Sequence, residues 1–298
     1  MKINRRTFLK SSGLLTGLAL TSKSSLLKAL TLENGSFKVI KGNIGIFTER
    51  GGTIGLFVND DSVITIDSQF PETAKNFVEH LKSKTNRKID YLFNTHHHGD
   101  HTSGNKFLSS YANEIVANEN CVRLQKIRIN SEDSFPASKT FSDEMEINLG
   151  KEKIKAYHFG KAHTGGDAVY HFVNHNVVHF GDLVFNGLYP FVNLEDEADF
   201  EGWIKYLETC YNKFDSETTF IFGHSTDPNK LTGDRENLIV MRDYLSSLLD
   251  FVKKNKSEGK TKVEITSVSE IPNTPKRIEA WEGALKINIE QAYDYLNR

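Results

Sequence analysis

The chain has 298 residues, of which 38% are hydrophobic and 26% charged, as in an ordinary globular protein with one large core. Its formal net charge of −2 is unevenly spread, because residues 1–30 carry six basic side chains and no acidic one, which leaves 31 basic against 39 acidic residues in the rest. This mildly acidic body has no basic stripe that would neutralise phosphates, which argues against a nucleic-acid partner.

The first 30 residues resemble a twin-arginine export signal. The letters RRTFLK at residues 5–10 precede a short, weakly apolar run over residues 13–20. That run is too short to span a membrane, and no cysteine near its end would carry a lipid. We therefore expect residues 1–30 to be a signal segment read by the twin-arginine export machinery, with a periplasmic or secreted product and no stable membrane anchor.

The next segment alternates strand-like runs with turn residues. Four runs rich in β-branched and aromatic residues are SFKVI, IGIFTE, TIGLFV and SVITID, and Gly, Asn and Asp separate them. This pattern predicts a β-meander. The apolar stripe of Ala74, Phe77, Val78 and Leu81 then predicts a helix from about residue 71 to residue 84.

Strands and helices also alternate in the rest of the chain. The predicted strands are IDYLFNT, KIKAYHFG, AVYHFV, NVVHFGD and TTFIFGHS. The predicted helices cover DFEGWIKYLETCYNKF and residues 236–254 and 274–296. Because no linker or low-complexity tract interrupts them, we expect packed sheets with helices outside and one domain over residues 31–298.

The two cysteines, Cys121 and Cys210, do not make a disulfide framework. We expect two separate, partly buried thiols without a catalytic role. Their spacing leaves an oxidised pair open.

The stretch NTHHHGDHTSGN places four histidines and one aspartate in six positions directly after an apolar strand. In an extended chain His96 and His98 point to one side, while His97 points to the other and takes a structural or supporting role. Asp100 and His101 are adjacent and fit a second centre beside the first. Imidazole and carboxylate are ligands that zinc readily accepts, so the stretch predicts a metal site.

Three later residues repeat the arrangement of a strand followed by a metal-type side chain. They are His163 in GKAHTGGD, Asp182 in VVHFGDLVF and His224 in FIFGHS. Ligands far apart in sequence but gathered at one sheet edge are expected for a catalytic metal site. The other histidines lack partners at ligand spacing and are expected to be packed or solvated: His80, His158, His171, His175 and His179.

With Asp67 at the end of the VITID strand, this pattern resembles the metallo-β-lactamase-fold superfamily of hydrolases over about residues 35–230. The resemblance implies an α/β (α+β) fold, a four-layer αββα sandwich with a dinuclear site at one edge. The implied ligands of one zinc are His96, His98 and His163. Those of the other are Asp100, His101 and His224, with Asp182 as the bridge. Asp67 would orient ligands without touching metal.

The implied chemistry is hydrolysis with two Zn²⁺ ions, although Mn or Fe also fits these ligand types. The two ions would share and activate a water that attacks a carbonyl, and Asp100 would orient this nucleophile. We expect cleavage of an ester, thioester, lactone or amide bond in a small-molecule substrate.

Departures from one lactamase subclass bear on the substrate. That subclass has a Cys ligand where this chain has Asp182, and a Lys where it has Phe185. Leu188, Tyr189 and Phe191 in the loop NGLYPFVN either form a pocket for an apolar acyl group or simply pack. Lys276 and Arg277 correspond either to the basic residues of glyoxalase-II-type enzymes or to a solvated helix start.

Three alternatives to this hydrolase are open. The first is a true β-lactamase, for which the periplasm is a suitable location. The second is a non-catalytic metal-binding accessory protein, which the complete ligand set disfavours. The third, an iron oxidoreductase, is weaker because its relatives add a flavin domain that this chain is too short to contain.

Overall fold

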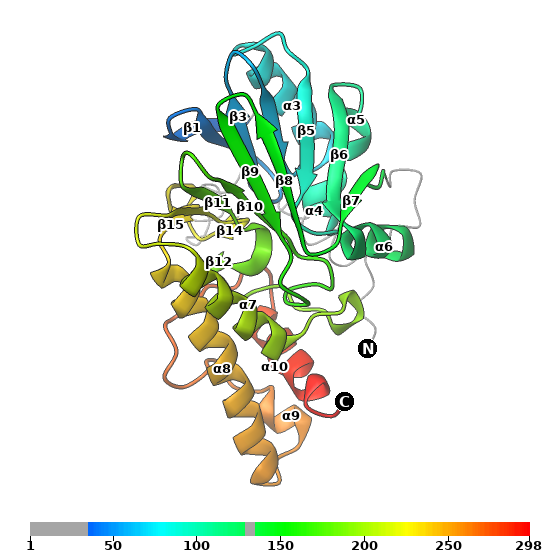
Figure 1. Ribbon diagram of the computed structural model, residues 1–298. Coiled ribbons are helices and arrows are strands. Elements are labelled where there is room, and N and C mark those ends of the chain that lie inside the picture. The colour runs from blue at the N-terminus through cyan, green and yellow to red at the C-terminus, as the bar shows by residue number, and fades with distance from the viewer. Residues whose placement is uncertain (1–34, 129–134) are drawn as a thin grey trace, which may run out of the picture.

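Two β-sheets lie face to face in the computed structural model, and helices cover the outer side of each sheet (Figure 1). The structure describes residues 35–128 and 135–298, so the expected export signal at residues 1–30 lies outside the described residues. The predicted four-layer αββα sandwich is confirmed.

The first sheet has seven strands in the order β1-β2-β3-β4-β5-β6-β7. They are β1 (Ser36–Lys41), β2 (Ile44–Thr48), β3 (Ile54–Val58), β4 (Val63–Ile66), β5 (Ile89–Asn94), β6 (Ala112–Asn118) and β7 (Lys139–Phe141). Strands β1 to β4 pair antiparallel, as the predicted meander requires, and β4 to β7 pair parallel. The segments that follow β4 and β5 therefore start from the same edge of the sheet.

The second sheet has six strands in the order β15-β13-β11-β10-β9-β8. They are β8 (Glu144–Leu149), β9 (Glu152–Tyr157), β10 (Val169–Phe172), β11 (Val177–His179), β13 (Thr219–Ile221) and β15 (Thr232–Gly233). Only β11 and β13 pair parallel within this sheet. A separate parallel pair joins β12 (Phe185–Asn186) to β14 (His224–Ser225).

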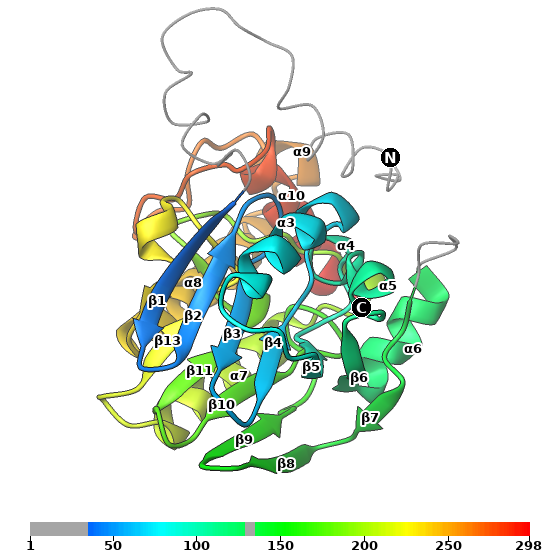
Figure 2. The ribbon, with the colours of Figure 1, turned by 90° about the horizontal axis from the view of Figure 1, so that it is seen from above.

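The helices divide between the two outer faces. Those on the first sheet are α3 (Pro71–Lys82), α4 (Gly99–Thr102), α5 (Asn105–Leu108) and α6 (Glu119–Arg128). Those of the second half are α7 (Phe200–Lys213), α8 (Glu236–Ser257), α9 (Lys262–Ile265) and α10 (Ala284–Tyr295). Figure 1 shows α8 beside α7 and α10, and Figure 2 shows α3 over the strands of the first sheet.

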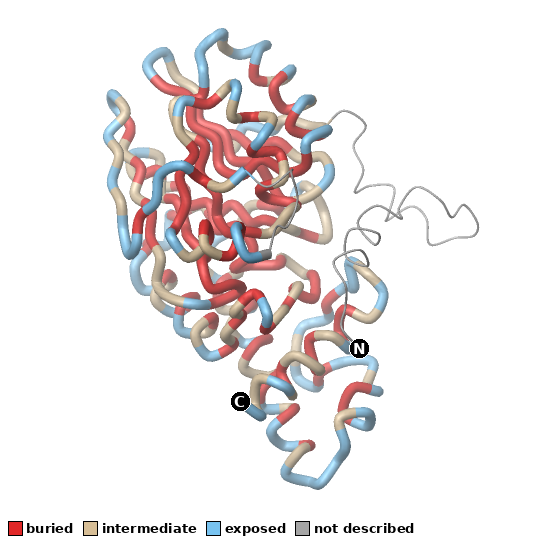
Figure 3. The backbone as a smooth tube through the Cα atoms, turned by 90° about the vertical axis from the view of Figure 1, so that its right-hand side faces the viewer, coloured by how far each residue is buried: buried red, intermediate tan, exposed pale blue. Residues whose placement is uncertain are grey.

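Three hydrophobic cores fill the spaces between the four layers. Alternation along β4 shows the cause, because Val63 enters the core under α3 while Ile64 and Ile66 enter the core between the sheets. Figure 3 shows this burial running through the sheets, with exposed backbone at the loops and helix ends. Cys121 and Cys210 are free thiols buried in two different cores, so they do not form the oxidised pair.

The predicted helix over residues 274–296 is wrong at its start, because α10 begins at Ala284. Pro275 restricts the backbone before it, and Gly283 adopts a φ of +81° directly ahead of the helix. Between them, Ile278 forms an isolated parallel bridge with Leu188. Arg277 is neither solvated nor at a helix start: it is buried and donates to the carbonyl oxygen of Leu188 at 2.8 Å.

The patterning predicts no element between residues 105 and 150, where the structure has α5, β6, α6, β7 and β8. Strand β8 alternates between exposed and half-buried residues, so it contains no apolar run. Among the described residues, no helix is long and apolar enough to cross a membrane.

Candidate metal centre

Strand pairing brings the candidate ligands to one edge of the sandwich. Ile66 on β4 pairs with Phe93 on β5, so the chain after each strand leaves the sheet at the same level. His179 on β11 pairs with Ile221 on β13, which places the next residues of both strands together in the same way. His163 follows β9 in a loop, and the short helix α4 carries Asp100 and His101.

His96, His98 and His163, here the first cluster, direct three nitrogen atoms toward one point. Nδ1 of His98 lies 3.0 Å from Nε2 of His96 and 3.1 Å from Nε2 of His163. Ligand atoms about 2.0–2.1 Å from a tetrahedral zinc ion lie roughly 3.3 Å from one another. One nitrogen cannot form hydrogen bonds to both neighbours through a single proton, whereas a cation at the centre satisfies all three. The donor set therefore fits a metal ion.

Asp100, His101 and His224, here the second cluster, form a second group of donor atoms. Nε2 of His224 lies 3.1 Å from Oδ2 of Asp100 and 3.3 Å from Nε2 of His101. These atoms lie within 4.8 Å of one another. Two imidazoles and one carboxylate are also ligands that zinc accepts.

Asp182 lies between the clusters and turns one oxygen toward each. Oδ2 is 3.7 Å from Nε2 of His96 and 3.6 Å from Nε2 of His163. Oδ1 is 3.1 Å from Nε2 of His101 and 3.4 Å from Nε2 of His224. The Asp182 carboxylate thus joins the two clusters. The residues that the sequence singles out as ligands all meet here.

Two glycines make room for these groups. A Cβ atom on Gly223 would lie 2.0 Å from Oδ1 of Asp182, and one on Gly52 would lie 2.1 Å from Cε1 of His101. Such distances are far inside van der Waals contact, so the backbone can approach the site only without a side chain.

Asp67 and Thr95 fix the imidazole rings on the protein side of the centre. Nδ1 of His101 donates to Oδ2 of Asp67 at 2.7 Å, which leaves Nε2 facing the second cluster. The hydroxyl of Thr95 donates to the same carboxylate at 2.8 Å and accepts from Nδ1 of His96 at 3.0 Å. One buried carboxylate thus orients a ring in each cluster. The role of Thr95 was not predicted from the sequence. Its position directly before His96 is the only feature of the sequence that points to it.

The metal-free clusters differ in their electrostatics. Burial and repulsion among the histidines lower the pKa of His96 and the pKa of His163 well below the ordinary value. In the second cluster, burial works in the same direction but nearby carboxylates outweigh it. They raise the pKa of His101 well above the ordinary value and the pKa of His224 to about 9. His96 and His163 are therefore neutral near pH 7, whereas His101 and His224 hold protons.

A third acidic contact was not predicted from the sequence. Oδ1 of Asp196 lies 3.3 Å from Nε2 of His97, and Oδ2 lies 3.4 Å from Nε2 of His98. Asp196 ends the 3-10 helix η3 (Leu194–Asp196), in a polar stretch without a periodic pattern that would have singled it out. His97 turns away from the first cluster toward this carboxylate.

The remaining histidines lie outside both clusters. His158 contacts the Asp167 carbonyl at 2.7 Å, His175 pairs with Glu152, and His179 contacts the Thr53 carbonyl at 3.1 Å. The rings of His80 and His171 pack on phenylalanines.

The three residues named for a substrate pocket separate in the structure. Leu188 and Tyr189 are buried in the core beneath α8, where Tyr189 packs against Tyr244. Phe191 is half-buried, and its ring lies 5.3 Å from that of His98. Of the three, Phe191 alone has a ring contact with a cluster residue among the described contacts.

Residues 47–224 match the Metallo-beta-lactamase superfamily, and the chain belongs to that family. Together with the His and Asp clusters, this membership makes the protein a metal-dependent hydrolase.

Curated relatives include a type 2 metallo-beta-lactamase of Elizabethkingia meningoseptica, 24% identical over 63% of this chain and 74% of the relative. A hydroxyacylglutathione hydrolase of Pelagibacter ubique is 30% identical over 39% of this chain and 44% of the relative. The chain thus spans about half the length of the hydroxyacylglutathione hydrolases that it matches.

Solved structures share the fold. A metallo-beta-lactamase from Pontibacter korlensis has a TM-score of 0.61 at 17% identity and covers 71% of this chain and 99% of its own. A double mutant of a sec-alkyl sulfatase has a TM-score of 0.69 at 15% identity and covers 97% of this chain and 55% of its own. The second likeness therefore extends to most of the helices at the C-terminal end.

Proposed function

We propose that this protein is a dinuclear zinc hydrolase that cleaves an ester, thioester, lactone or amide bond of a small molecule. The observation that carries the proposal is Asp182, which directs one carboxylate oxygen to each of two complete donor clusters. We propose the first cluster as the ligands of one ion, the second cluster as those of the other, and Asp182 as the bridge.

Zinc held by these residues would lower the pKa of a bound water and polarise the scissile carbonyl. The chain itself places the ligands and limits access, since His96, His101 and His163 are almost completely buried, whereas 23% of the His224 side chain is exposed. We therefore propose that substrate enters on the His224 side.

Asp100 has a positioning role toward the attacking water in this proposal. Burial favours the neutral acid, but the charges of His101 and His224 outweigh it and hold the pKa of Asp100 at about 2. A carboxylate with so low a pKa stays ionised and can accept a hydrogen bond, but it holds a transferred proton poorly. Asp100 therefore orients the nucleophile and passes its proton on.

Aromatic rings border both clusters. At the second cluster, Phe185 stacks on His224 with ring centroids 5.4 Å apart. At the first cluster, Phe191 lies against His98. An apolar ring at Phe185 cannot grip a substrate carboxylate as a lysine would. We therefore favour substrates with an apolar group beside the scissile carbonyl, as in aryl esters, lactones and acyl thioesters.

The test is hydrolysis by the zinc-loaded protein of a panel comprising an aryl ester, a lactone, acyl thioesters and a chromogenic cephalosporin, each with and without a chelator. We expect chelator-sensitive turnover of at least one carbonyl substrate, and its loss in Asp100→Ala and His163→Ala. Full activity in either variant would contradict the proposed site.

A true β-lactamase is the second candidate, favoured by the 24% identity to the Elizabethkingia enzyme. Fast, chelator-sensitive turnover of the cephalosporin would establish it. A protein that holds two zinc ions but turns over no substrate, including a sec-alkyl sulfate ester, would favour a non-catalytic accessory role instead.

We also propose export through the twin-arginine route, on the strength of the RRTFLK motif at residues 5–10. On this proposal the mature protein is periplasmic or secreted and consists of the domain from about residue 31 onward. Replacement of Arg5 and Arg6 by lysine would leave the protein in the cytoplasm of a host with this export route. Unchanged export of the double variant would contradict the assignment.

A further inference from the structure

Asp196 contacts a candidate ligand from outside both clusters. Its Oδ2 atom faces Nε2 of His98 at 3.4 Å and accepts a hydrogen bond from Nδ2 of Asn193 at 2.6 Å. Its Oδ1 atom faces Nε2 of His97 at 3.3 Å. The residue is 7% exposed, so its carboxylate meets these three donors with little competition from water.

The contact with His98 decides which nitrogen of that ring faces the metal position. Nδ1 of His98 points into the first cluster, and Nε2 points the opposite way, toward Asp196. A carboxylate accepts a hydrogen bond only from a ring nitrogen that carries a proton. Asp196 therefore keeps the proton of the His98 ring on Nε2 and the lone pair on Nδ1. His96 and His163 differ from His98, since both turn Nε2 inward.

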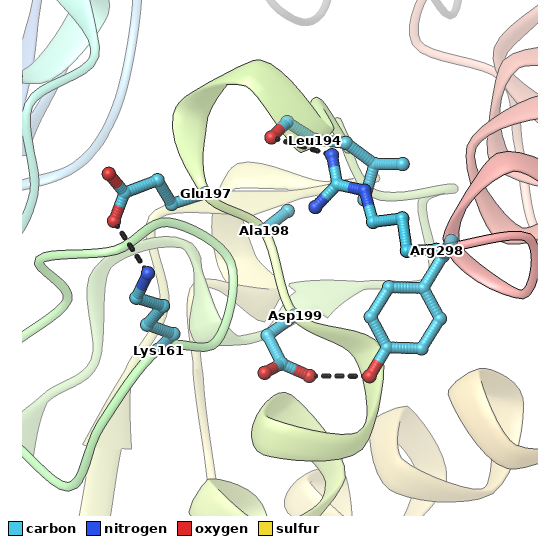
Figure 4. Close-up of a pocket in the computed structure, with 7 residues that line it drawn as sticks. Lys161, Leu194, Glu197, Ala198, Asp199 and Arg298 are labelled. Atoms are coloured by element: carbon cyan, nitrogen blue, oxygen red, sulfur yellow. Dashed lines mark hydrogen bonds and ion pairs between the residues drawn. The ribbon is translucent and has the colours of Figure 1, made fainter.

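The C-terminal segment clamps the loop that carries Asp196. The backbone N–H of Leu194 donates to Oε1 of Gln291 at 2.8 Å, and its carbonyl accepts from Arg298 at 3.2 Å. The hydroxyl of Tyr295 donates to Oδ1 of Asp199 at 2.7 Å. Figure 4 shows the contacts of Arg298 and Asp199 on either side of a small cavity, with the loop running between them.

The loop that carries Asp196 is also held by residues outside the C-terminal segment. Glu197 adopts a left-handed φ of +64°, which a residue with a side chain holds only when its surroundings fix it. Its carboxylate binds both guanidinium nitrogens of Arg123, at 2.7 and 2.8 Å, and Lys161 at 2.9 Å. The carbonyl of Asp196 itself accepts from the Gly165 N–H at 2.9 Å, two residues beyond His163.

We propose that Asp196 is a positioning residue that holds the His98 ring with Nδ1 toward the first metal position. The clamp from the C-terminal segment keeps Asp196 in place. This inference rests on the metal-binding part of the proposed function and adds a residue to it. Asp196 thereby holds the His98 ring of the first cluster as Asp67 holds the His101 ring of the second.

The test compares Asp196→Asn with Glu195→Gln, which removes the same charge from the adjacent, exposed residue of the same 3-10 helix. Asparagine keeps the shape but offers one oxygen to two histidine donors, so its NH₂ group must face one of them. We expect Zn²⁺ affinity at the tighter position, measured by competition with a chromophoric chelator, to fall about 10- to 100-fold in Asp196→Asn. Glu195→Gln should change it less than about twofold.

The NMR spectrum of a Co²⁺-loaded sample distinguishes a positioning role of Asp196 from a merely structural one. In the parent protein the Nε2 proton of His98 should appear as a hyperfine-shifted NMR signal that exchanges slowly with water, because Asp196 accepts it. In Asp196→Asn this signal should shift or exchange rapidly, while the signal of the Nδ1 proton of His101, held by Asp67, stays in place.

The outcomes separate the two proposals. A parent protein that binds no Zn²⁺ would remove the proposed function and this inference with it. An Asp196→Asn protein that binds two ions as tightly as the parent, and whose His98 signal is unchanged, would overturn the positioning role alone. Loss of a third, separate ion in the variant would also overturn it, because Asp196 would then be a ligand in its own right.

Asn193→Ala provides a second route should Asp196→Asn fail to fold. It keeps Asp196 itself but removes the 2.6 Å hydrogen bond to Oδ2 and also the hydrogen bond that the Asn193 side chain accepts from the Glu195 N–H at 3.0 Å. We expect a fall in Zn²⁺ affinity of about 3- to 10-fold and a faster-exchanging His98 proton. An unchanged affinity together with an unchanged signal would contradict the role of Asp196.

Discussion

The two halves of the metal centre are built on opposite principles. In the first cluster three imidazole nitrogens converge, and the lowered pKa of His96 and of His163 keeps these two rings neutral near pH 7. The second cluster pairs histidines of raised pKa with Asp100 and Asp182, so without metal it neutralises itself. A cation in the first half would relieve the mutual repulsion of the converging nitrogen lone pairs, whereas in the second half it must displace protons.

This contrast assigns different tasks to the two halves. A preformed site that releases few protons favours tight binding, because little rearrangement accompanies it. A site that gains and loses protons, and where 23% of the His224 side chain is exposed, suits the position where water and substrate exchange. We infer that the first cluster anchors the metal centre and that the second works next to the substrate.

The largest expected effect is that of His163→Ala, which removes one of the three nitrogens of the first cluster. If this cluster anchors the centre, kcat/KM should fall on the order of 10³-fold and bound zinc should drop below one ion per chain. Zinc analysis and steady-state kinetics on the same preparation measure both.

His80→Ala is the control for that variant, since His80 lies on α3 and packs against Phe47, away from both clusters. Its activity should stay within about twofold of the parent. A His163→Ala protein that keeps two ions would show that the first cluster is not the anchor.

Gly223→Ala should affect both halves at once. The added methyl would lie 2.0 Å from Oδ1 of Asp182 and would push aside the carboxylate that joins the clusters. We expect kcat/KM to fall on the order of 10²-fold, with weaker zinc binding at both positions rather than one. Calorimetric titration with Zn²⁺ separates the two positions, and loss at a single position would show that Asp182 does not bridge.

The pH dependence of zinc binding distinguishes the halves without a mutation. Because the pKa of His101 is raised well above its ordinary value and that of His224 to about 9, zinc must displace a proton from each, and affinity at the second cluster should weaken about a hundredfold per pH unit as the pH falls from 8 to 6.5. The lowered pKa of His96 and of His163 leaves both histidines neutral in that range, so neither releases a proton and affinity at the first cluster should depend less steeply on pH.

Calorimetry in buffers of different ionisation enthalpy counts the released protons directly. Equal proton release at both positions would remove the distinction drawn between the clusters.

The position of the candidate ligands after apolar strands predicted that they gather at one sheet edge, whereas the αββα fold and the division into two clusters were implied by the resemblance to the metallo-β-lactamase superfamily. Strand ends meet at one edge by topology, so His163, Asp182 and His224 could be grouped without coordinates. Asp196 could not be found in this way, since it lies in a loop with no periodic pattern and reaches His98 only through tertiary packing. The start of α10 was misplaced for a similar reason, because the long-range bridge between Ile278 and Leu188 overrides local preference.

The most direct test of a two-part metal centre is anomalous X-ray diffraction at the zinc edge from crystals of the zinc-loaded protein. We predict two peaks, one among His96, His98 and His163 and one among Asp100, His101 and His224, with the Asp182 carboxylate between them. A single peak, or a peak held by His97 and Asp196, would contradict it.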